Sequence, residues 1–287
     1  MAWTTRPLTE HFGIELSGAR IGPDLPQADR QAVYEAVVQH GVAVVRGQRL
    51  SDDELYDFAD SLGVVVPMPK DIPDIPSARV QALSNLDADG NLLPPDHPYV
   101  RQNTANELWH VDQTYMRPRA TVSMLYGLVI PPEGGNTEFC DLRLAYEALT
   151  PEQQARFAPL TATHSTLHSR KLTGFTDWSE AALAMLGSVD RPLIGFHEAT
   201  GRKTLALASH ISEVSGHSPE ESAALMRALT ERATSPERCY SHRWRAGDML
   251  LWDNRCVMHR ARPFDLTRHG RDMRSVRLVD TADVEPA

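Results

Sequence analysis

The sequence contains little cysteine and no long hydrophobic run. Its three cysteines, Cys140, Cys239 and Cys256, are an odd number at wide spacing, which argues against a disulfide framework and against a Cys-x-x-Cys zinc site. We therefore expect reduced, buried thiols. No run of about 18 apolar residues could cross a bilayer, and the first residues lack the apolar core of a secretory signal. The sequence predicts a cytoplasmic protein without a membrane partner.

Positive charge is also scarce. Lys and Arg total 29 against 38 Asp and Glu, for a formal net charge of -9. A field of this sign repels phosphate backbones and anionic membrane surfaces, so nucleic acid is not an expected partner. Hydrophobic residues make up 41% and charged residues 23% of the 287 residues. These are ordinary values for a globular protein that buries a sizeable core.

Glycine-rich phosphate loops, internal repeats and low-complexity tracts are absent as well, and Gly134-Gly135 alone indicates a turn. Helical spacing predicts a helix over 28–40, which Gly41 would end, and a buried strand follows over 41–48. Ser51 and Glu54 form a capping-box pattern for a second helix over 51–63. Residues 66–105 are rich in Pro, Asp and Asn and predict a long irregular segment that could serve as a lid.

The remainder of the chain alternates between short β-type runs and helical segments. The predicted strands cover 121–130, 191–196, 203–209, 247–253 and 273–280, and the predicted helices lie near 142–157, 178–187 and 218–233. No strict strand–helix alternation appears, so a parallel sheet is not expected. The pattern predicts a mainly β protein with flanking helices, built as a sandwich or jelly roll.

Residues 109–112 read Trp-His-Val-Asp, and this short segment could supply two metal ligands. On a strand, His110 and Asp112 would share a face because side chains alternate with period two. His259 follows an apolar run and could be a third ligand. Two histidines and one carboxylate form the facial triad of non-haem iron(II) oxygenases, which leaves coordination positions open. The same three ligands would also suit a zinc hydrolase.

Arg271 lies twelve positions after His259, in a segment that becomes strand-like. Arginine offers a planar, bidentate fork that suits a carboxylate. Taken alone, the His-x-Asp pattern would indicate a loop histidine hydrogen-bonded to a nearby carboxylate. Without the metal motif, Arg271 would be a solvated charge in a run of basic residues. A third reading, a jelly-roll binding module without a metal, therefore stays open at this point.

Three longer stretches resemble the taurine dioxygenase and chlorophenoxyacetate dioxygenase family of iron(II)/2-oxoglutarate oxygenases. They are NELWHVDQTY, PPEGGNTEFCDLRLAYEAL and HRWRAGDMLLWDNRCVMHRARPFD, and they look closer to the chlorophenoxyacetate branch. The resemblance covers most of the chain and implies one domain over 1–287 with a distorted jelly-roll fold, the cupin-like double-stranded β-helix. A homo-oligomer is compatible with it.

The resemblance also implies an activity and a set of site residues. It assigns His110, Asp112 and His259 to iron(II), and Arg271 and Thr137 to the cosubstrate 2-oxoglutarate. With dioxygen, such an enzyme hydroxylates a small organic substrate and releases succinate and carbon dioxide. Attack on a carbon that bears an ether oxygen would cleave the ether bond.

One position departs from the family pattern. Four residues after Arg271, where relatives commonly have a second arginine near the substrate anion, this chain has Ser275. On a strand, Arg277 would share the face of Arg271 and Ser275, whereas Arg274 would point away. Arg277 is thus the better candidate replacement. Further candidate substrate contacts, each weaker than these, are Tyr115, Tyr126 and His210.

Overall fold

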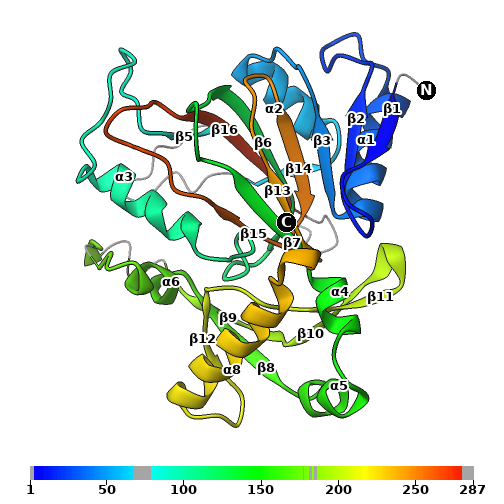
Figure 1. Cartoon of the computed structure of the whole chain (residues 1–287), viewed down its shortest axis with the longest axis vertical. Helices are drawn as coiled ribbons and strands as arrows, with labels where there is room; N and C mark the ends of the chain where they lie inside the picture. The colour runs from blue at the N-terminus through cyan, green and yellow to red at the C-terminus, as the bar shows by residue number, and fades with distance from the viewer. Residues whose placement is uncertain (1–2, 67–78, 177, 181–182, 184–185, 280–287) are drawn as a thin grey trace.

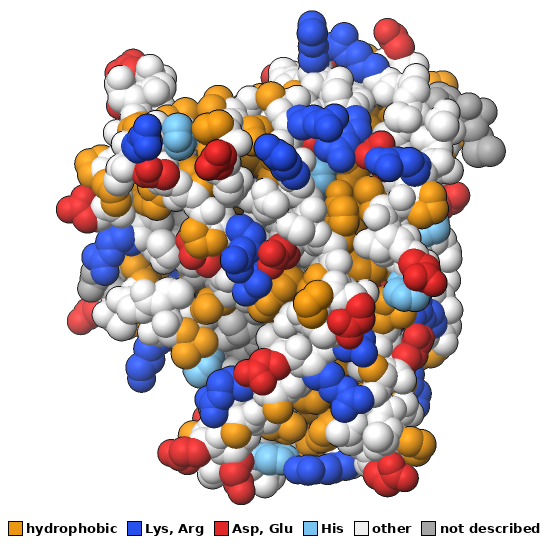
Figure 2. All heavy atoms as spheres, viewed as in Figure 1, with side chains coloured by type: hydrophobic (Ala, Val, Ile, Leu, Met, Phe, Trp, Pro, Cys, Tyr) orange, Lys and Arg blue, Asp and Glu red, His pale blue; other side chains and the backbone are white. Residues whose placement is uncertain are grey.

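The computed structural model describes residues 3–66, 79–176, 178–180, 183 and 186–279. Two β-rich regions are stacked along its long axis, with a large sheet in the upper half of Figure 1 and smaller sheets in the lower half. None of the helices in the described residues is long and apolar enough to cross a membrane. Acidic and basic side chains are interspersed over the face seen in Figure 2.

The large sheet has eight strands drawn from both ends of the sequence. Their order is β1 (Thr4–Pro7), β2 (Ile14–Ser17), β3 (Val42–Val45), β14 (Met249–Asp253), β6 (Ala120–Val129), β16 (Asp272–Val279) and β4 (Val64–Val65), with β5 (Gln81–Ser84) also paired to β16. Neighbours run antiparallel, except that β2 and β3 are parallel. The central strands β6 and β14 are almost wholly buried, which is why their sequences are continuous apolar runs.

A three-stranded sheet packs against one face of the large sheet. It consists of β13 (Cys239–His242), β7 (Thr137–Asp141) and β15 (Val257–Ala261). Between the two sheets lies an apolar cluster that contains Phe139 from β7, Val257 from β15 and Trp252 from β14. This arrangement agrees with the predicted jelly roll, in which two sheets enclose a core.

Two helices cover the opposite face of the large sheet, α1 (Gln27–His40) and α2 (Asp52–Asp60). Val33 and Val37 of α1 and Leu55 and Phe58 of α2 enter one core with the sheet side chains. The capping box predicted at Ser51 is present, with both reciprocal hydrogen bonds. The helix predictions for this part of the chain are confirmed.

The lower region is a second packed unit of strands and helices. Its sheets pair β12 (Ile211–Val214), β8 (Thr161–Ser165) and β9 (Ser188–Pro192), and β10 (Ile194–His197) with β11 (Arg202–Leu205). The helices in and around it are α4 (Leu142–Glu147), α5 (Pro151–Phe157), α6 (Thr166–Leu172) and α8 (Pro219–Ala233), and short 3-10 turns are η2 (Glu198–Thr200) and η3 (Pro236–Arg238).

Several expectations from the sequence need correction. The segment 66–105 is not irregular throughout, because it contains β5, α3 (Pro98–Asn103) and the 3-10 turn η1 (Thr104–Glu107); residues 67–78 lie outside the described residues. The run 191–196 is two strands, since Pro192 has no N–H to extend the ladder. The strand predicted over 203–209 ends at Leu205. In the segment 178–187, where a helix was predicted, residues 181, 182, 184 and 185 lie outside the described residues; of the rest, 180 and 183 are helical and 178, 179, 186 and 187 are not.

Candidate metal centre

The first two candidate ligands lie between η1 and β6, on a segment that is not a regular strand as predicted. His110 forms a single antiparallel bridge with His259 of β15, with backbone N···O distances of 2.9 and 2.8 Å. The chain then turns at Asp112, and Gln113 has a positive φ of 51°. This bridge brings residues 149 apart in sequence side by side, and it leaves His110 and Asp112 facing the same space.

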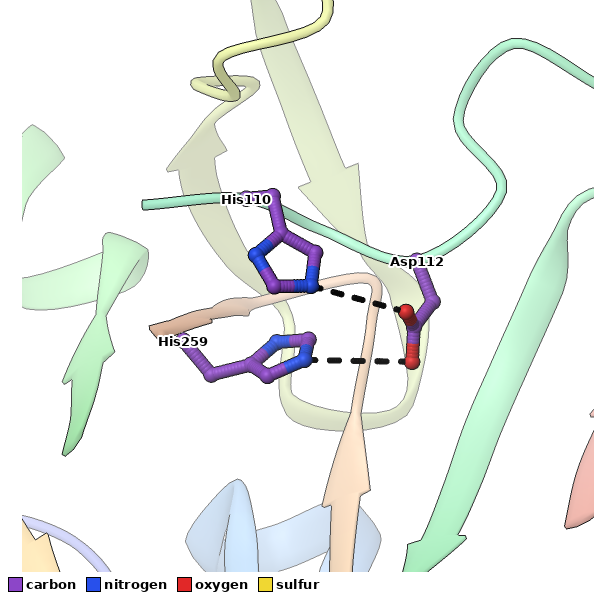
Figure 3. Close-up of side chains that lie close together, drawn as sticks. All are labelled: His110, Asp112 and His259. Atoms are coloured by element: carbon purple, nitrogen blue, oxygen red, sulfur yellow. Dashed lines mark ion pairs between the residues drawn. The ribbon is translucent and has the colours of Figure 1, made fainter. Parts of the chain in front are cut away.

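The three candidate ligands point toward one another (Figure 3). The distance from His110 Nε2 to Asp112 Oδ1 is 3.8 Å, and that from His259 Nε2 to Asp112 Oδ2 is 3.9 Å. One ligand atom from each residue lies within 4.8 Å of the others, and all three residues are buried. This donor set could hold a divalent metal ion on one side and leave other coordination positions open.

The surroundings hold both imidazoles neutral and orient the ring of His110. His110 Nδ1 lies 2.8 Å from the carbonyl oxygen of Leu108, so a proton on Nδ1 would leave the Nε2 lone pair facing Asp112. Burial lowers the pKa of His110, and burial with the neighbouring His110 holds the pKa of His259 well below its ordinary value. A neutral imidazole is the form that binds a metal.

Asp112 is buried but stays ionised. Burial alone would raise its pKa, but the Arg277 guanidinium and the two imidazoles, with a hydrogen bond from Ser123, lower it below its ordinary value. Arg277 Nε lies 3.4 Å from Asp112 Oδ2, and Arg277 Nη1 donates to Gln81 Oε1 at 2.8 Å. The carboxylate therefore has a cation beside it even without a metal.

Two polar residues that the sequence analysis missed fix the Asp112 side chain. Ser123 Oγ donates to Asp112 Oδ2 at 2.6 Å, and Asn254 Nδ2 donates to Ser123 Oγ at 2.8 Å. The Asp112 backbone N–H donates to Asn254 Oδ1 at 3.3 Å, so the hydrogen bonds among the three residues form a closed ring. The one available signal was that Ser123 is a polar residue inside the apolar run of β6, where it is fully buried.

The three residues open into a cavity of about 130 Å³. Its other lining side chains include Leu125, Thr137, Trp252, Arg271, Ser275 and Arg277. The predicted alternation along β16 is confirmed at this cavity, because Ser275 and Arg277 face it together with Arg271. Arg274 points elsewhere and pairs with Asp52 and Asp272.

Arg271 is a partly buried cation for which the described residues supply no counter-ion. Burial lowers the pKa of Arg271 to about 10, and its Nε has no hydrogen-bond partner among the described residues. Gly135, whose φ is 65°, lies beside Arg271, since a Cβ at this glycine would stand 3.5 Å from Arg271 Nε, an ordinary contact distance. A buried charge is costly unless an opposite charge neutralises it. Arg271 is therefore well placed to bind an anion.

Thr137 lies at the start of β7 and is buried in the same cavity. Its hydroxyl oxygen accepts a hydrogen bond from Trp244 Nε1 at 2.9 Å, so the hydroxyl proton remains available to donate to a ligand. Thr137 pairs in register with Ala261 of β15, two residues beyond His259. The strand pairing therefore puts Thr137 and the metal ligands in one cavity.

The remaining sequence candidates divide into two groups. The His210 ring lies 4.8 Å from the ring of Tyr115 and 6.1 Å from that of His110, so both residues lie beside the metal centre. His210 is in a turn before β12. Tyr126 is not brought to the site, because it is buried in the core and its hydroxyl donates to the carbonyl of Gln48.

Comparison with known proteins agrees with this geometry. Residues 4–277 match the family described as "Taurine catabolism dioxygenase TauD, TfdA family". A 2-oxoglutarate-dependent 2,4-dichlorophenoxyacetate dioxygenase from Cupriavidus pinatubonensis is 37% identical over 288 residues, covering 99% of this chain and 100% of that protein. An (S)-phenoxypropionate/2-oxoglutarate dioxygenase from Sphingobium herbicidovorans is 32% identical, covering 93% and 92%.

A solved structure extends the likeness to three dimensions. The crystal structure of AAD-2 in complex with Mn(II) and N-oxalylglycine superposes with a TM-score of 0.90 at 33% identity, and the match covers 100% of both chains. The mainly β, jelly-roll fold predicted from the sequence is thereby confirmed.

Proposed function

Because this chain belongs to the TauD, TfdA family and is a 2-oxoglutarate-dependent dioxygenase that uses iron(II) and dioxygen, we propose which residues perform each task. His110, Asp112 and His259 hold iron(II). Arg271 and Thr137 bind 2-oxoglutarate. The substrate is a small organic acid, which enters on the side of Tyr115 and His210.

One observation supports this assignment above the others: a two-histidine, one-carboxylate cluster shares a cavity with an arginine that no carboxylate of the described residues neutralises. The donor set suits iron(II) with open positions. A keto acid has one end that can chelate the metal and, in 2-oxoglutarate, a distal carboxylate that fits the arginine fork. Both features thus serve one cosubstrate.

Each protein group would make a distinct contribution. Bound iron(II), with 2-oxoglutarate and dioxygen, supplies the oxidative decarboxylation that yields succinate and carbon dioxide and places a hydroxyl group on the substrate. His110 and His259 are neutral, so protons do not compete with the metal. Arg271 fixes the far end of the cosubstrate, and Thr137 donates a hydrogen bond to it. Trp252 and Leu125 supply apolar wall in the cavity.

The relatives suggest the kind of substrate. Those named above act on a dichlorophenoxyacetate and a phenoxypropionate, which are small aryloxy acids. We propose an aryloxyalkanoate or a related small acid for this chain, with ether cleavage when the hydroxylated carbon bears the ether oxygen. Ser275 and Arg277 in the cavity, and Tyr115 and His210 beside His110, are the proposed substrate-side residues.

The two alternatives left open by the sequence gain no support. The relatives described above are oxygenases, and a zinc hydrolase using the same ligands has no need of Arg271 as a dicarboxylate anchor. A binding module without a metal would not need three buried ligand atoms within 4.8 Å of one another.

Anaerobic titration tests the assignment directly. Adding Fe(II) and 2-oxoglutarate to the wild-type protein should produce the visible charge-transfer band of a chelated keto acid. His110→Ala should lose the band, whereas His11→Ala, at an exposed position, should keep it. If the wild-type protein gave no band, and hydrolysed esters equally well without oxygen, the hydrolase reading would replace this one.

A further inference from the structure

A second, partly buried arginine lies beside the metal centre, next to the contact between Ser169 and His210. Arg170 belongs to α6, directly after Ser169, whose Oγ lies 2.8 Å from His210 Nδ1. His210 in turn contacts the rings of Tyr115 and His110. Helix α6 thus packs beside the metal centre through the contact between Ser169 and His210, and Arg170 is the next residue of the helix. Nothing in the sequence patterns had marked this arginine.

The described residues give the Arg170 side chain no hydrogen bond or ion pair. Its Nε is buried without a hydrogen bond, and no ion pair joins it to a carboxylate within the part of the chain that the structure describes. Burial lowers its pKa, the charges of Tyr115 and Asp112 raise it, and that of Arg277 lowers it again. These influences agree with the contacts of α6 and indicate that the guanidinium lies near all three side chains.

The charges at the site do not balance. The charges of iron(II) and of the 2-oxoglutarate dianion would cancel. Asp112 alone would then face three guanidiniums, those of Arg271, Arg277 and Arg170. The other carboxylate of the cavity, Glu107, interacts with Arg262. Uncompensated buried cations are costly, so a further anion would be stabilised here.

Ser275, which faces the cavity, has no charge. Arg277 lies two residues further along the same face of β16, 3.4 Å from Asp112, and Arg170 comes from a different element. We propose that Arg170, together with Arg277, binds the oxyanion group of the substrate on the Tyr115–His210 side of the metal centre. This inference rests on the proposed function.

Binding measurements can test the role of Arg170 without turnover. Protein loaded with Mn(II) and N-oxalylglycine is titrated by calorimetry with 2,4-dichlorophenoxyacetate, with hexyl sulfate and with the neutral 2,4-dichlorophenoxyacetamide. Losing a charge-assisted pair weakens binding about ten- to a hundredfold. Arg170→Met should therefore bind at least one of the two anions that much more weakly and leave the affinity for the amide unchanged. The matched control Lys171→Met, exposed on the same helix, should bind all three like the wild type.

The outcomes separate this proposal from the one it rests on. The Fe(II)/2-oxoglutarate band should persist in Arg170→Met and in Arg170→Lys, which shows that both variants fold and keep the metal site. Arg170→Lys should recover part of the anion affinity. Equal binding of anions and amide by the wild type, no binding of either anion, or an Arg170→Met variant with wild-type anion affinity would overturn the role of Arg170 while leaving the metal site intact. A wild-type protein without the band would contradict the proposed function instead.

Discussion

At the scale of single residues, the cavity at the metal centre is lined by more arginines than carboxylates. Arg271 is the clearest case, because burial is the cause of its lowered pKa and no acidic side chain in the described part of the chain pairs with it. Its position twelve residues after His259 suggested its role, but the sequence could not show that the guanidinium is buried. The structure adds Asn85, whose side-chain oxygen accepts the backbone N–H of Arg271 at 2.7 Å and so fixes the backbone at this residue.

Arg271→Lys should weaken 2-oxoglutarate binding about ten- to a hundredfold, because lysine keeps the charge but loses the bidentate fork. Anaerobic titration of the visible band against 2-oxoglutarate concentration measures the change. Arg274→Lys is the matched control on the same segment, since Arg274 faces Asp52 and not the cavity. Equal affinity in Arg271→Lys and wild type would show that Arg271 does not contact the cosubstrate.

Ser123 and Asn254 should matter to the metal although neither touches it. Ser123→Ala removes the 2.6 Å hydrogen bond to Asp112 Oδ2, and such outer partners typically contribute 10- to 100-fold in metal affinity, an order-of-magnitude figure. We expect a loss within about that range when Fe(II) or Mn(II) is titrated into the variant. Thr121→Ala, on the same strand with its hydroxyl donating to Leu278 O, is the control and should bind metal like the wild type.

At the scale of elements, local sequence predicted the structures that local forces determine. The capping box of α2 and the continuous apolar runs of β6 and β14 are visible in the sequence and occur as expected. Strand β5 was missed because its register partners, such as Asp272 for Ser84, lie far along the chain. The His110 segment failed as a strand for a related reason, since only one bridge to β15 forms before the chain turns.

Strand β8 contains a histidine that should make stability depend on pH. Burial lowers the pKa of His164 to about 3, and the charges of Arg191 and Arg119 add to the effect. At a pH below about 6.5, the ordinary pKa of histidine, this residue is protonated in the unfolded chain but stays neutral in the folded chain. The free energy of unfolding should therefore fall as pH drops from about 6.5 toward 3, by about 1.4 kcal/mol per pH unit from this residue.

Urea unfolding of wild type and His164→Gln at pH 7.5 and 5.5 measures that share. Glutamine can keep the hydrogen bond to Thr114 Oγ1, which lies 2.9 Å from His164 Nδ1, but it does not titrate. The variant should lose about 1.4 kcal/mol less than the wild type between the two pH values. Parallel losses in the two proteins would mean that His164 is not held neutral in the folded state.

At the scale of the whole molecule, the metal centre joins segments that belong to different packed units. Val111, between the first two ligands, and Met258, beside the third, are in the core of the lower region. Val276 and Leu278 flank Arg277 and are in the core under α1 and α2. No local sequence pattern could have predicted that these units meet at one cavity. The family resemblance suggested that the ligands share one site, and the backbone bridge between His110 and His259 brings them together.

Because ligands at this centre contact both units, their binding should stabilise the chain as one body. A ligand at 100 times its Kd stabilises the native state by about 2.7 kcal/mol, which corresponds to a rise in Tm of about 5 °C or somewhat more for a chain of this size. Mn(II) with N-oxalylglycine should raise Tm by more than the two added separately, since the keto acid analogue needs the metal, and Asp112→Ala should abolish the joint effect. A calorimetric scan with two transitions, of which one moves and the other does not, would show that the centre stabilises a single unit and that the two cores unfold independently.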